Sequence, residues 1–392
     1  MEAIRKFQDQ ILAQAFFLKA DNEYHNSIKD AFIKTYRHLF INKFKDAPES
    51  NWTIVTPENL ASLLPLLYAE RPLIIYNEPN EEFKSTISQP HIVLQMLEYL
   101  QLEKGNTVFE VGAASGWNAA LMGALVGEEG HVYSAEIIPE MAMQAKENIE
   151  KQQISNVTIL HRDAGFGYEE KAPFDRIVFT AGSYDLPRCF YDQLKDDGIL
   201  LMVLGMPGGG DQLLQLKKVD GHFEAMESLG CDFIKWTGKY QNTPLEPVKQ
   251  EELPEWSYLK DQEVSRRPFW WGGMSRLPFY YRTFAFRSFL SITEPGVRFF
   301  KENQALVTGS GYFGILNSKK DSLTIAREKQ LITYGNDESK TIFMNSLHAW
   351  IDMGMPAAAH FKLKIYPSGT KINAAPNQWV VERTDSTFVW SM

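Results

Sequence analysis

Strand-like and helix-like segments alternate between residues 107 and 205, and this alternation constrains the fold more than any other feature of the chain. Short apolar runs predict strands at 107–112, 131–136, 157–163, 174–181 and 199–205. The segments between them predict helices at 117–126, 139–152 and 187–194. Such an alternation is typical of a parallel, doubly wound α/β sheet, in which ligands bind at the carboxyl ends of the strands.

The segments on either side of this core follow other patterns. Residues 1–50 look helical, with apolar side chains three and four apart at Ile28, Ala31, Phe32, Tyr36 and Phe40. Residues 53–89 predict a loop-rich approach to a helix that starts at Pro90. Two runs, 213–219 and 223–236, predict antiparallel strands that close the sheet.

A proline- and charge-rich stretch near residue 243 predicts a linker, and the chain beyond it is rich in aromatic residues. One helix is predicted there, at 338–354, among strand-like runs at 280–286, 304–309, 360–367 and 378–384. We therefore predict an N-terminal helical segment at 1–55, a Rossmann-like domain at 56–242, a linker at 243–262 and a second, smaller α+β domain at 263–392.

Composition excludes several classes of protein. Among 392 residues, 44% are hydrophobic and 23% charged, as in ordinary globular proteins, and the net charge of -9 argues against a nucleic-acid or anionic-membrane binder. The cysteines, Cys189 and Cys231, form no Cys-x-x-Cys motif, and no His-x-x-x-His pair occurs, so we expect no metal site. The chain has no apolar run near the roughly 20 residues of a membrane helix. We expect a cytoplasmic protein.

The stretch VFEVGAASGWN, residues 108–118, has the form of a strand, a glycine turn and a helix. A dinucleotide site needs Gly-x-Gly-x-x-Gly, but Ala114 and Trp117 stand where the second and third glycines belong. No Gly-Lys-Ser/Thr follows, so a phosphate loop is excluded as well. What remains is Glu110 and Gly112 followed by Ser115 and Gly116. A carboxylate here would repel a diphosphate and favour a ligand that carries positive charge.

Two further acidic residues end the next two predicted strands. Glu136 could accept hydrogen bonds from ribose hydroxyls, and Asp163 could accept one from an adenine amino group. Together with Glu110 they fit S-adenosylmethionine, which has a sulfonium, an amino-acid group and no phosphate. The alternative is that all three are merely solvated loop acids.

Over residues 28–240 the chain resembles the protein-L-isoaspartate O-methyltransferase family. The motifs that carry the resemblance are YRHLF at 36–40, STISQPHIV at 85–93, FEVGAASGWNAA at 109–120, RDAGFGYEEKAPFDRIVFTAG at 162–182 and LPRCFYDQLKDDGILLMVLG at 186–205. The resemblance implies a carboxyl methyltransferase that uses S-adenosylmethionine and acts on an aspartyl or isoaspartyl carboxylate.

The resemblance also implies roles for individual residues. Ser88 occupies the place of the active-site serine that contacts the substrate carboxylate. The cofactor-contacting positions implied in this way are Thr86, Ile87, Ser88, Ser115, Glu136, Ile137, Asp163, Ala164 and, in the last strand, Thr237. Ala114 and Ala164 stand where the family usually has glycine. Ser88 could instead cap the helix that starts at Pro90, and we expect His91 to be structural rather than catalytic.

The chemistry implied needs no general base, because a carboxylate with a pKa of about 4 is already ionised at neutral pH.

The extension beyond residue 243 resembles the C-terminal domain of longer homologues that modify ribosomally made, lanthipeptide-type precursor peptides. We expect it to set the acceptor rather than to serve the chemistry. With the acidic stretch EPNEEFK at 78–84, it favours a dedicated peptide enzyme. A general repair enzyme and a cofactor-binding adaptor are the alternatives. The aromatic cluster at 266–273 is interpreted as domain core, with a peptide-gripping surface as the alternative.

Overall fold

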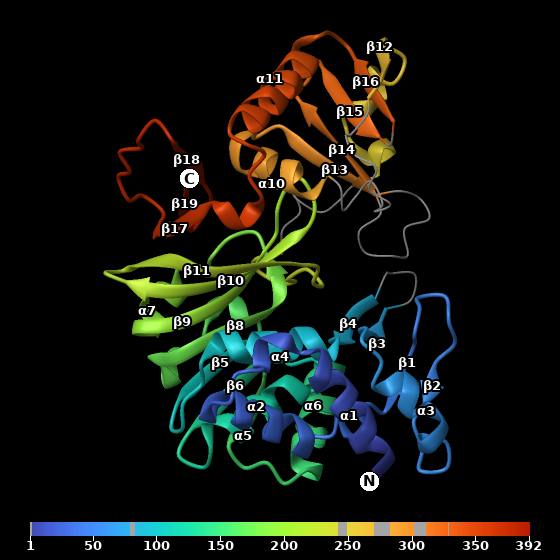
Figure 1. Cartoon of the computed structure of the whole chain (residues 1–392), viewed down its shortest axis with the longest axis vertical. Coiled ribbons are helices and arrows are strands. Elements are labelled where there is room, and N and C mark those ends of the chain that lie inside the picture. The colour runs from blue at the N-terminus through green and yellow to red at the C-terminus, as the bar shows by residue number, and fades with distance from the viewer. Residues whose placement is uncertain (1, 79–82, 242–248, 270–282, 302–310, 328) are drawn as a thin grey trace.

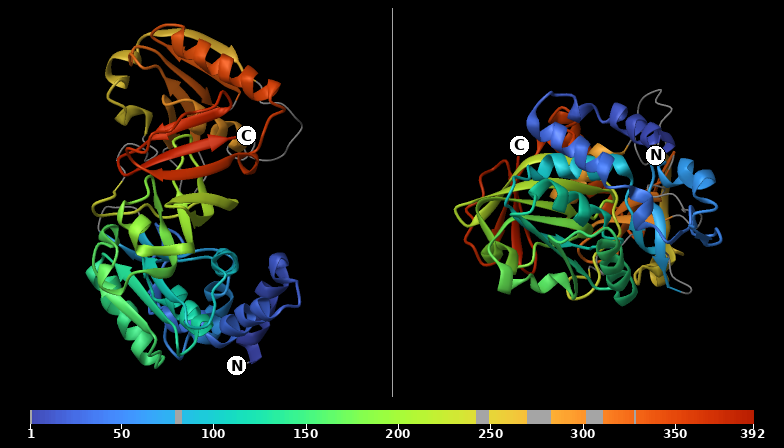
Figure 2. Two further views of the ribbon diagram at one scale, coloured as in Figure 1. Left: turned by 90° about the vertical axis from the view of Figure 1, so that its left-hand side faces the viewer. Right: turned by 90° about the horizontal axis from the view of Figure 1, so that it is seen from below.

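The computed structural model describes residues 2–78, 83–241, 249–269, 283–301, 311–327 and 329–392 (Figure 1). The N-terminal helices lie at one end of the long axis, and a small antiparallel sheet lies at the other (Figures 1 and 2). Within the described residues, no helix is long and apolar enough to cross a membrane.

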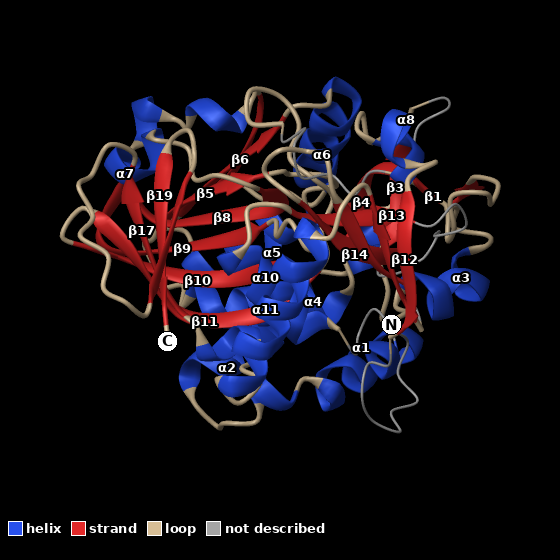
Figure 3. Ribbon diagram, turned by 90° about the horizontal axis from the view of Figure 1, so that it is seen from above, coloured by secondary structure: helices blue, strands red, loops and turns tan. Residues whose placement is uncertain are grey.

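A ten-stranded mixed sheet runs through the centre of the molecule (Figure 3). In spatial order its strands are β18 (Gln378–Glu382), β19 (Ser386–Ser391), β17 (Lys362–Pro367), β11 (His222–Cys231), β10 (Asp211–Val219), β9 (Leu194–Leu204), β8 (Phe174–Ser183), β5 (Thr107–Val111), β6 (His131–Glu136) and β7 (Val157–His161). The five strands from β9 to β7 are parallel, and those from β18 to β10 pair antiparallel. The predicted α/β sheet is confirmed.

Each face of this sheet packs against its own hydrophobic core, because successive side chains of a strand point to opposite faces. Val108 belongs to one core and Phe109 to the other. The first core includes residues of the helices α1 (Glu2–Gln14), α2 (Glu23–Lys34), α3 (Leu60–Leu67), α4 (Pro90–Leu100), α5 (Trp117–Val126) and α6 (Pro139–Lys151). The second includes residues of α7 (Cys189–Gln193), α10 (Phe284–Thr293) and α11 (Glu338–Asp352).

Two short hairpins lie beside the N-terminal helices. The strand β1 (Lys43–Phe44) pairs with β2 (Thr53–Ile54), and β3 (Leu73–Asn77) pairs with β4 (Phe83–Ile87). The sequence predicted only loops over the second hairpin. Its strands form because Leu73, Ile75 and Ile87 are buried in the first core.

A separate five-stranded antiparallel sheet lies in the C-terminal half, as expected of a second domain. Its spatial order is β12 (Glu263–Pro268), β16 (Gln330–Tyr334), β15 (Leu323–Arg327), β14 (Gly311–Leu316) and β13 (Val297–Lys301). The ring of Phe343 in α11 packs against Phe286 and Phe313, with centroids 5.6 and 6.0 Å apart. The short helix α8 (Trp256–Leu259) lies in the predicted linker. Part of the aromatic cluster, at 270–273, and the predicted strand at 304–309 lie outside the described residues.

The last three strands differ from the expected arrangement. The sequence assigns residues 362–391 to the C-terminal unit, but they extend the large sheet, where Ile365 of β17 pairs with Phe223 of β11. Their apolar side chains, Leu363, Ile365, Phe388 and Trp390, are buried in the second core. Residues 284–286, expected as strand, begin the helix α10, because Phe286, Phe289 and Leu290 bury one helical face.

Candidate active site

The glycine turn after β5 is held by close contacts, and both these contacts and its backbone conformation favour glycine at position 112. Gly112 has a φ of +97°, and its N–H donates to the carbonyl of Ala135 at 2.8 Å. The hydroxyl of Thr180 donates to the carbonyl of Gly112 at 2.6 Å. A Cβ on residue 112 would lie 2.5 Å from that hydroxyl oxygen, which no side chain tolerates. The turn ends at Gly116, where α5 begins with a φ of +83°.

Glu136 at the end of β6 braces this turn. One of its carboxylate oxygens accepts the N–H of Ala114 at 2.8 Å, and the other accepts the N–H of Ile138 at 3.0 Å. Burial raises the pKa of the Glu136 carboxyl, while the backbone hydrogen bonds oppose that rise. Each oxygen keeps a second lone pair with which it can accept a further hydrogen bond.

Glu110 lies behind the turn rather than at its surface. The side chain is fully buried; Asn118 donates to one carboxylate oxygen at 2.6 Å, and the hydroxyl of Ser134 donates to the other. Burial raises the pKa of Glu110 to about 7. The sequence suggested that the Glu110 carboxylate faces a positively charged ligand. In the structure it is instead buried behind the turn, where it supports the turn through Asn118 and Ser134.

Asp163 and the segment 237–240 lie side by side at the next strand end. One carboxylate oxygen of Asp163 accepts the N–H of Gly165 at 2.8 Å, and the other accepts the N–H of Lys239 at 2.7 Å. A Cβ on Gly238 would lie 2.5 Å from Asp163 and 2.7 Å from Ile137. Thr237 precedes Gly238, so the structure brings it near Ile137 and Asp163. The neighbouring Ala164 is buried.

Ser88 lies in the short connection between β4 and α4. Gln89, not Ser88, occupies the N-cap position of α4, so the interpretation of Ser88 as a helix cap is not supported by this geometry. Ser88 and Thr86 are half-buried, and Ile87 is buried. His91 uses its backbone N–H to bond Glu70 at 3.2 Å, and its ring packs edge-on against Phe17.

Arg37 holds the connection between β4 and α4 through its backbone carbonyls, a role that was not predicted from the sequence. Its fully buried guanidinium donates to the carbonyls of Ser88 at 3.0 Å and Ile87 at 3.3 Å, and also to that of Leu67. Burial lowers the pKa of Arg37 to about 9, so the side chain stays charged at neutral pH. The one signal for this role in the sequence was its place in the YRHLF motif.

A half-buried ion pair at the carboxyl edge, between Lys235 and the buried Asp211, was also missed. The ammonium of Lys235 donates to both carboxylate oxygens of Asp211, whose side chain is 3% exposed. The neighbouring carboxylate raises the pKa of Lys235 against the opposing effect of burial. The pair joins the first residue of β10 to the segment after β11, at the edge where the other site residues gather.

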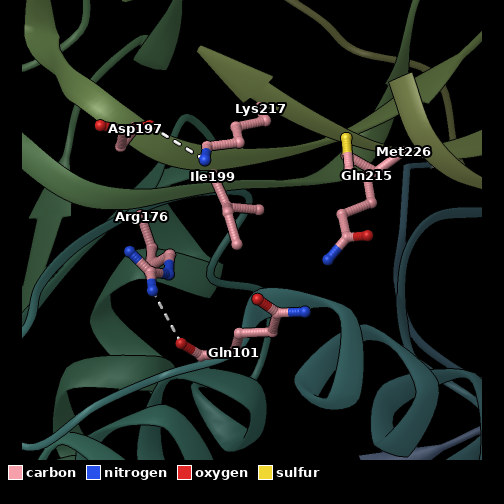
Figure 4. A pocket seen from close by; sticks show the side chains of 7 residues that line it. All are labelled: Gln101, Arg176, Asp197, Ile199, Gln215, Lys217 and Met226. Atoms are coloured by element: carbon pink, nitrogen blue, oxygen red, sulfur yellow. Dashed lines mark hydrogen bonds and ion pairs between the residues drawn. The ribbon is translucent and has the colours of Figure 1, made fainter. Parts of the chain in front are cut away.

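A pocket of about 260 Å³ lies at the opposite, amino edge of the sheet (Figure 4). Its lining residues are Gln101, Arg176, Asp197, Ile199, Gln215, Lys217 and Met226. Arg176 donates to the carbonyls of Leu100 and Gln101, and Lys217 pairs with Asp197. Because its charged groups already have protein partners and no predicted site residue lines it, this pocket is not the candidate site. Within the part of the chain that the structure describes, no cluster of three or more His, Cys, Asp or Glu could hold a metal ion.

Comparisons with known proteins point to one enzyme family. A sequence model of the family described as Protein-L-isoaspartate(D-aspartate) O-methyltransferase matches residues 18–241. The Protein-L-isoaspartate O-methyltransferase of Methanothrix thermoacetophila is 37% identical over 187 residues, which are 48% of this chain and 83% of that protein. The protein of the same name from Hyperthermus butylicus is 32% identical over 252 residues, 61% of this chain and 90% of that one.

One solved structure, of a protein-L-isoaspartate O-methyltransferase, is similar over nearly the whole chain. The match covers 92% of this chain and 96% of that one, with a TM-score of 0.54 and 21% identity. At this identity the likeness concerns the fold. Because it covers so much of the chain, it extends well beyond residue 241 into the C-terminal half.

Proposed function

Because the chain belongs to the protein-L-isoaspartate O-methyltransferase family, we propose that the carboxyl edge of β5, β6 and β7 is its methyl-donor site and Ser88 its acceptor-contacting residue. The enzyme is an S-adenosylmethionine-dependent protein-L-isoaspartate O-methyltransferase. Glu136 would accept the ribose hydroxyls, Asp163 the adenine amino group, and the turn at 112–116 would adjoin the amino-acid part of the donor.

This assignment rests on hydrogen bonds at the carboxyl ends of β5, β6 and β7. Glu136 holds the turn through Ala114, and Asp163 holds the segment 237–240 through Lys239. Both carboxylates retain lone pairs for a ligand. Thr86, Ile87, Ser115, Gly112, Gly116, Ile137, Ala164 and Thr237 would complete the wall of the site, while Glu110 would act through the turn that it supports.

Methyl transfer here is an in-line displacement. A carboxylate oxygen of the acceptor forms the new bond to the methyl carbon, the bond from carbon to sulfur breaks, and its electron pair stays on sulfur. The positive sulfonium and the negative carboxylate thus become a neutral thioether and a neutral methyl ester. The ester is then positioned to close to a succinimide. Since the nucleophile is already ionised, the protein's task is to align the reactants and exclude water.

The Ser88 hydroxyl would donate a hydrogen bond to one oxygen of the acceptor carboxylate, while the other oxygen attacks the methyl carbon. A neutral donor orients this carboxylate without pairing it as strongly as a cation would, so the nucleophile keeps its reactivity. Arg37 would set the position of Ser88 by holding its backbone carbonyl from beneath.

For the acceptor, we favour isoaspartyl carboxylates in proteins and peptides of unrelated sequence, as in repair. The C-terminal half shares its fold with a solved structure named protein-L-isoaspartate O-methyltransferase, so its presence alone does not indicate a precursor-peptide enzyme. Most of the acidic stretch used in favour of that alternative, at 79–82, lies outside the described residues.

The test is a panel of unrelated isoaspartyl peptides, each with its aspartyl counterpart, assayed with the full-length enzyme, the Ser88→Ala variant and S-adenosylmethionine. We expect every isoaspartyl peptide to yield its methyl ester, detected by mass spectrometry. Ser88→Ala should lower kcat by about 10- to 100-fold with little change in donor affinity, because a hydrogen bond to a charged group contributes about 1.5–3 kcal/mol. Methylation confined to one aspartyl peptide would instead establish a dedicated peptide enzyme, and an unchanged kcat would remove Ser88 from the site.

A further inference from the structure

The turn between β18 and β19 lies against the segment 237–240, although Asp385 and Tyr240 are 145 residues apart in the chain. Figures 1 and 2 show β17, β18 and β19 beside β10 and β11. Asp385 lies in this turn, and it makes three hydrogen bonds to two parts of the methyltransferase half.

The first contact of Asp385 is with Tyr240. The phenol of Tyr240 donates to a carboxylate oxygen of Asp385. Burial and the neighbouring carboxylate raise the pKa of this phenol, which therefore remains a donor at all physiological pH values. Tyr240 directly follows Lys239, whose N–H bonds Asp163.

The ring of Tyr240 also covers the loop that follows Asp163. A Cβ on Gly165 would lie 2.4 Å from a ring carbon of Tyr240, so the ring rests directly on the backbone of that loop. The ring of Tyr240 also meets Trp236 edge-on, with centroids 6.1 Å apart. The position of Tyr240 therefore sets how closely the segment 237–240 lies against Asp163.

The second and third contacts anchor Asp385 itself. Its carboxylate accepts the N–H of Arg188 at 3.2 Å, and its own N–H donates to the carboxylate of Asp185 at 2.7 Å. Next to it, the hydroxyl of Ser386 donates to the carbonyl of Leu186 and accepts a hydrogen bond from Tyr191. The turn is thus fixed to the loop between β8 and α7, which gives Asp385 a stable base from which to hold Tyr240.

We propose that Asp385 is a positioning residue for the methyl-donor site: by holding Tyr240 it keeps the segment 237–240 closed against Asp163, so that donor affinity depends on the C-terminal strands. This inference rests on the proposed function and extends it. The C-terminal region then does more than select an acceptor, because one of its residues completes the wall of the donor site.

The experiment measures binding of S-adenosylhomocysteine by calorimetry to the full-length protein, with thermal unfolding recorded for each variant. The variants are Asp385→Ala, which removes the acceptor, Tyr240→Phe, which removes the donor, and the double substitution. Tyr240→Phe keeps the ring on Gly165 and removes only the hydroxyl, so it carries the test if Asp385→Ala fails to fold. The matched control is Glu224→Gln, which removes a charge that bonds Lys364 of β17 at 2.6 Å; Glu224 lies near the start of β11, whereas the segment 237–240 follows its end.

We expect each single substitution to raise Kd by about fivefold or more, the usual range for coupled sites. The double substitution should raise Kd no further than either single one, because both remove the same contact. The KM for S-adenosylmethionine should rise likewise, with the KM for an isoaspartyl peptide unchanged, and Glu224→Gln should bind like the wild type.

Affinity within twofold of the wild type in both single variants would overturn the inference, whatever happens to their thermal stability. An equal loss in Glu224→Gln would overturn it too, because the effect would then be general loosening of the C-terminal strands. If the wild type itself bound no S-adenosylhomocysteine, the proposed function would fall first, and the two failures are thereby distinguished.

Discussion

At the scale of single residues, the buried carboxyl of Glu110 makes the stability of the protein depend on pH. It is enclosed with Asn118 and Ser134, and burial raises its pKa from 4.5 to about 7. Because the folded-state pKa is the higher one, the folded protein binds more protons than the unfolded chain between these two values. The contribution of this carboxyl to stability is therefore complete below about pH 4.5 and is lost as pH rises through 7.

This linkage predicts a difference between the wild type and Glu110→Gln. Between pH 4.5 and pH 8, the free energy of unfolding of the wild type should fall by about 2–3 kcal/mol more than that of the variant, since one pKa unit corresponds to about 1.4 kcal/mol. Urea denaturation at a series of pH values measures it. Parallel pH profiles for the two proteins would show that Glu110 does not titrate in this range.

The sequence predicted the positions of the strand ends better than the surroundings of the residues that lie there. The strand-end positions of Glu136 and Asp163 followed from the alternating pattern, and the structure joins each of them to a backbone N–H of the predicted site region. The burial of Glu110 could not be read from the pattern, because it depends on side chains supplied by α5 and β6. Ala114, noted as a departure from glycine, has a φ of +46°, so it adopts the left-handed backbone that glycine adopts most easily.

At the scale of elements, Arg37 connects the N-terminal segment to the connection that carries Ser88. Lysine has a single ammonium in place of the guanidinium fork, so it cannot serve the carbonyls of Leu67, Ile87 and Ser88 together. Arg37→Lys should therefore lower the free energy of unfolding by about 2–4 kcal/mol, because buried carbonyls lose their partners.

Chemical denaturation of this variant beside Arg5→Lys gives a matched comparison. Arg5 pairs with Asp9 on the exposed surface of α1, and such pairs contribute about 0–1 kcal/mol. Equal stability of the two variants would contradict the bracing role of Arg37. A selective rise in the KM of the isoaspartyl peptide would connect the brace to Ser88.

Elements with strong periodicity were predicted correctly, and those decided by tertiary contacts were not. The parallel strands and α11 follow from local patterns. The pairing of β3 with β4 and the joining of β17 to β11 depend on partners far away in the chain. A short apolar run such as 284–286 fits a strand or a helix equally well, and packing against α11 decides for the helix.

At the scale of the whole molecule, the C-terminal strands are part of the large sheet rather than an appended module. A chain that ends at residue 241 would lose Leu363, Ile365 and Phe388 from the second core. Burial of such side chains contributes about 1.5–3 kcal/mol each, a sum comparable to the net stability of about 5–15 kcal/mol that is typical of a domain. It would also expose the edge of β11, which invites aggregation.

We therefore expect the chain of residues 1–241 to aggregate or to unfold without a cooperative transition, as monitored by gel filtration and circular dichroism. Its resemblance to enzymes that lack an extension suggests the opposite outcome. A monomeric fragment with a sharp thermal transition and wild-type affinity for S-adenosylhomocysteine would show that β17, β18 and β19 are dispensable.

The central claim is that the carboxyl edge of the parallel strands binds the methyl donor through Glu136. Its most direct test is calorimetric titration of the wild type and Glu136→Ala with S-adenosylhomocysteine, with circular dichroism to show that both are folded. We expect micromolar binding by the wild type and a loss of about 1.5–3 kcal/mol of binding free energy in the variant, the contribution of a charge-assisted hydrogen bond. No heat from the folded wild type, or equal affinity in the two proteins, would contradict it.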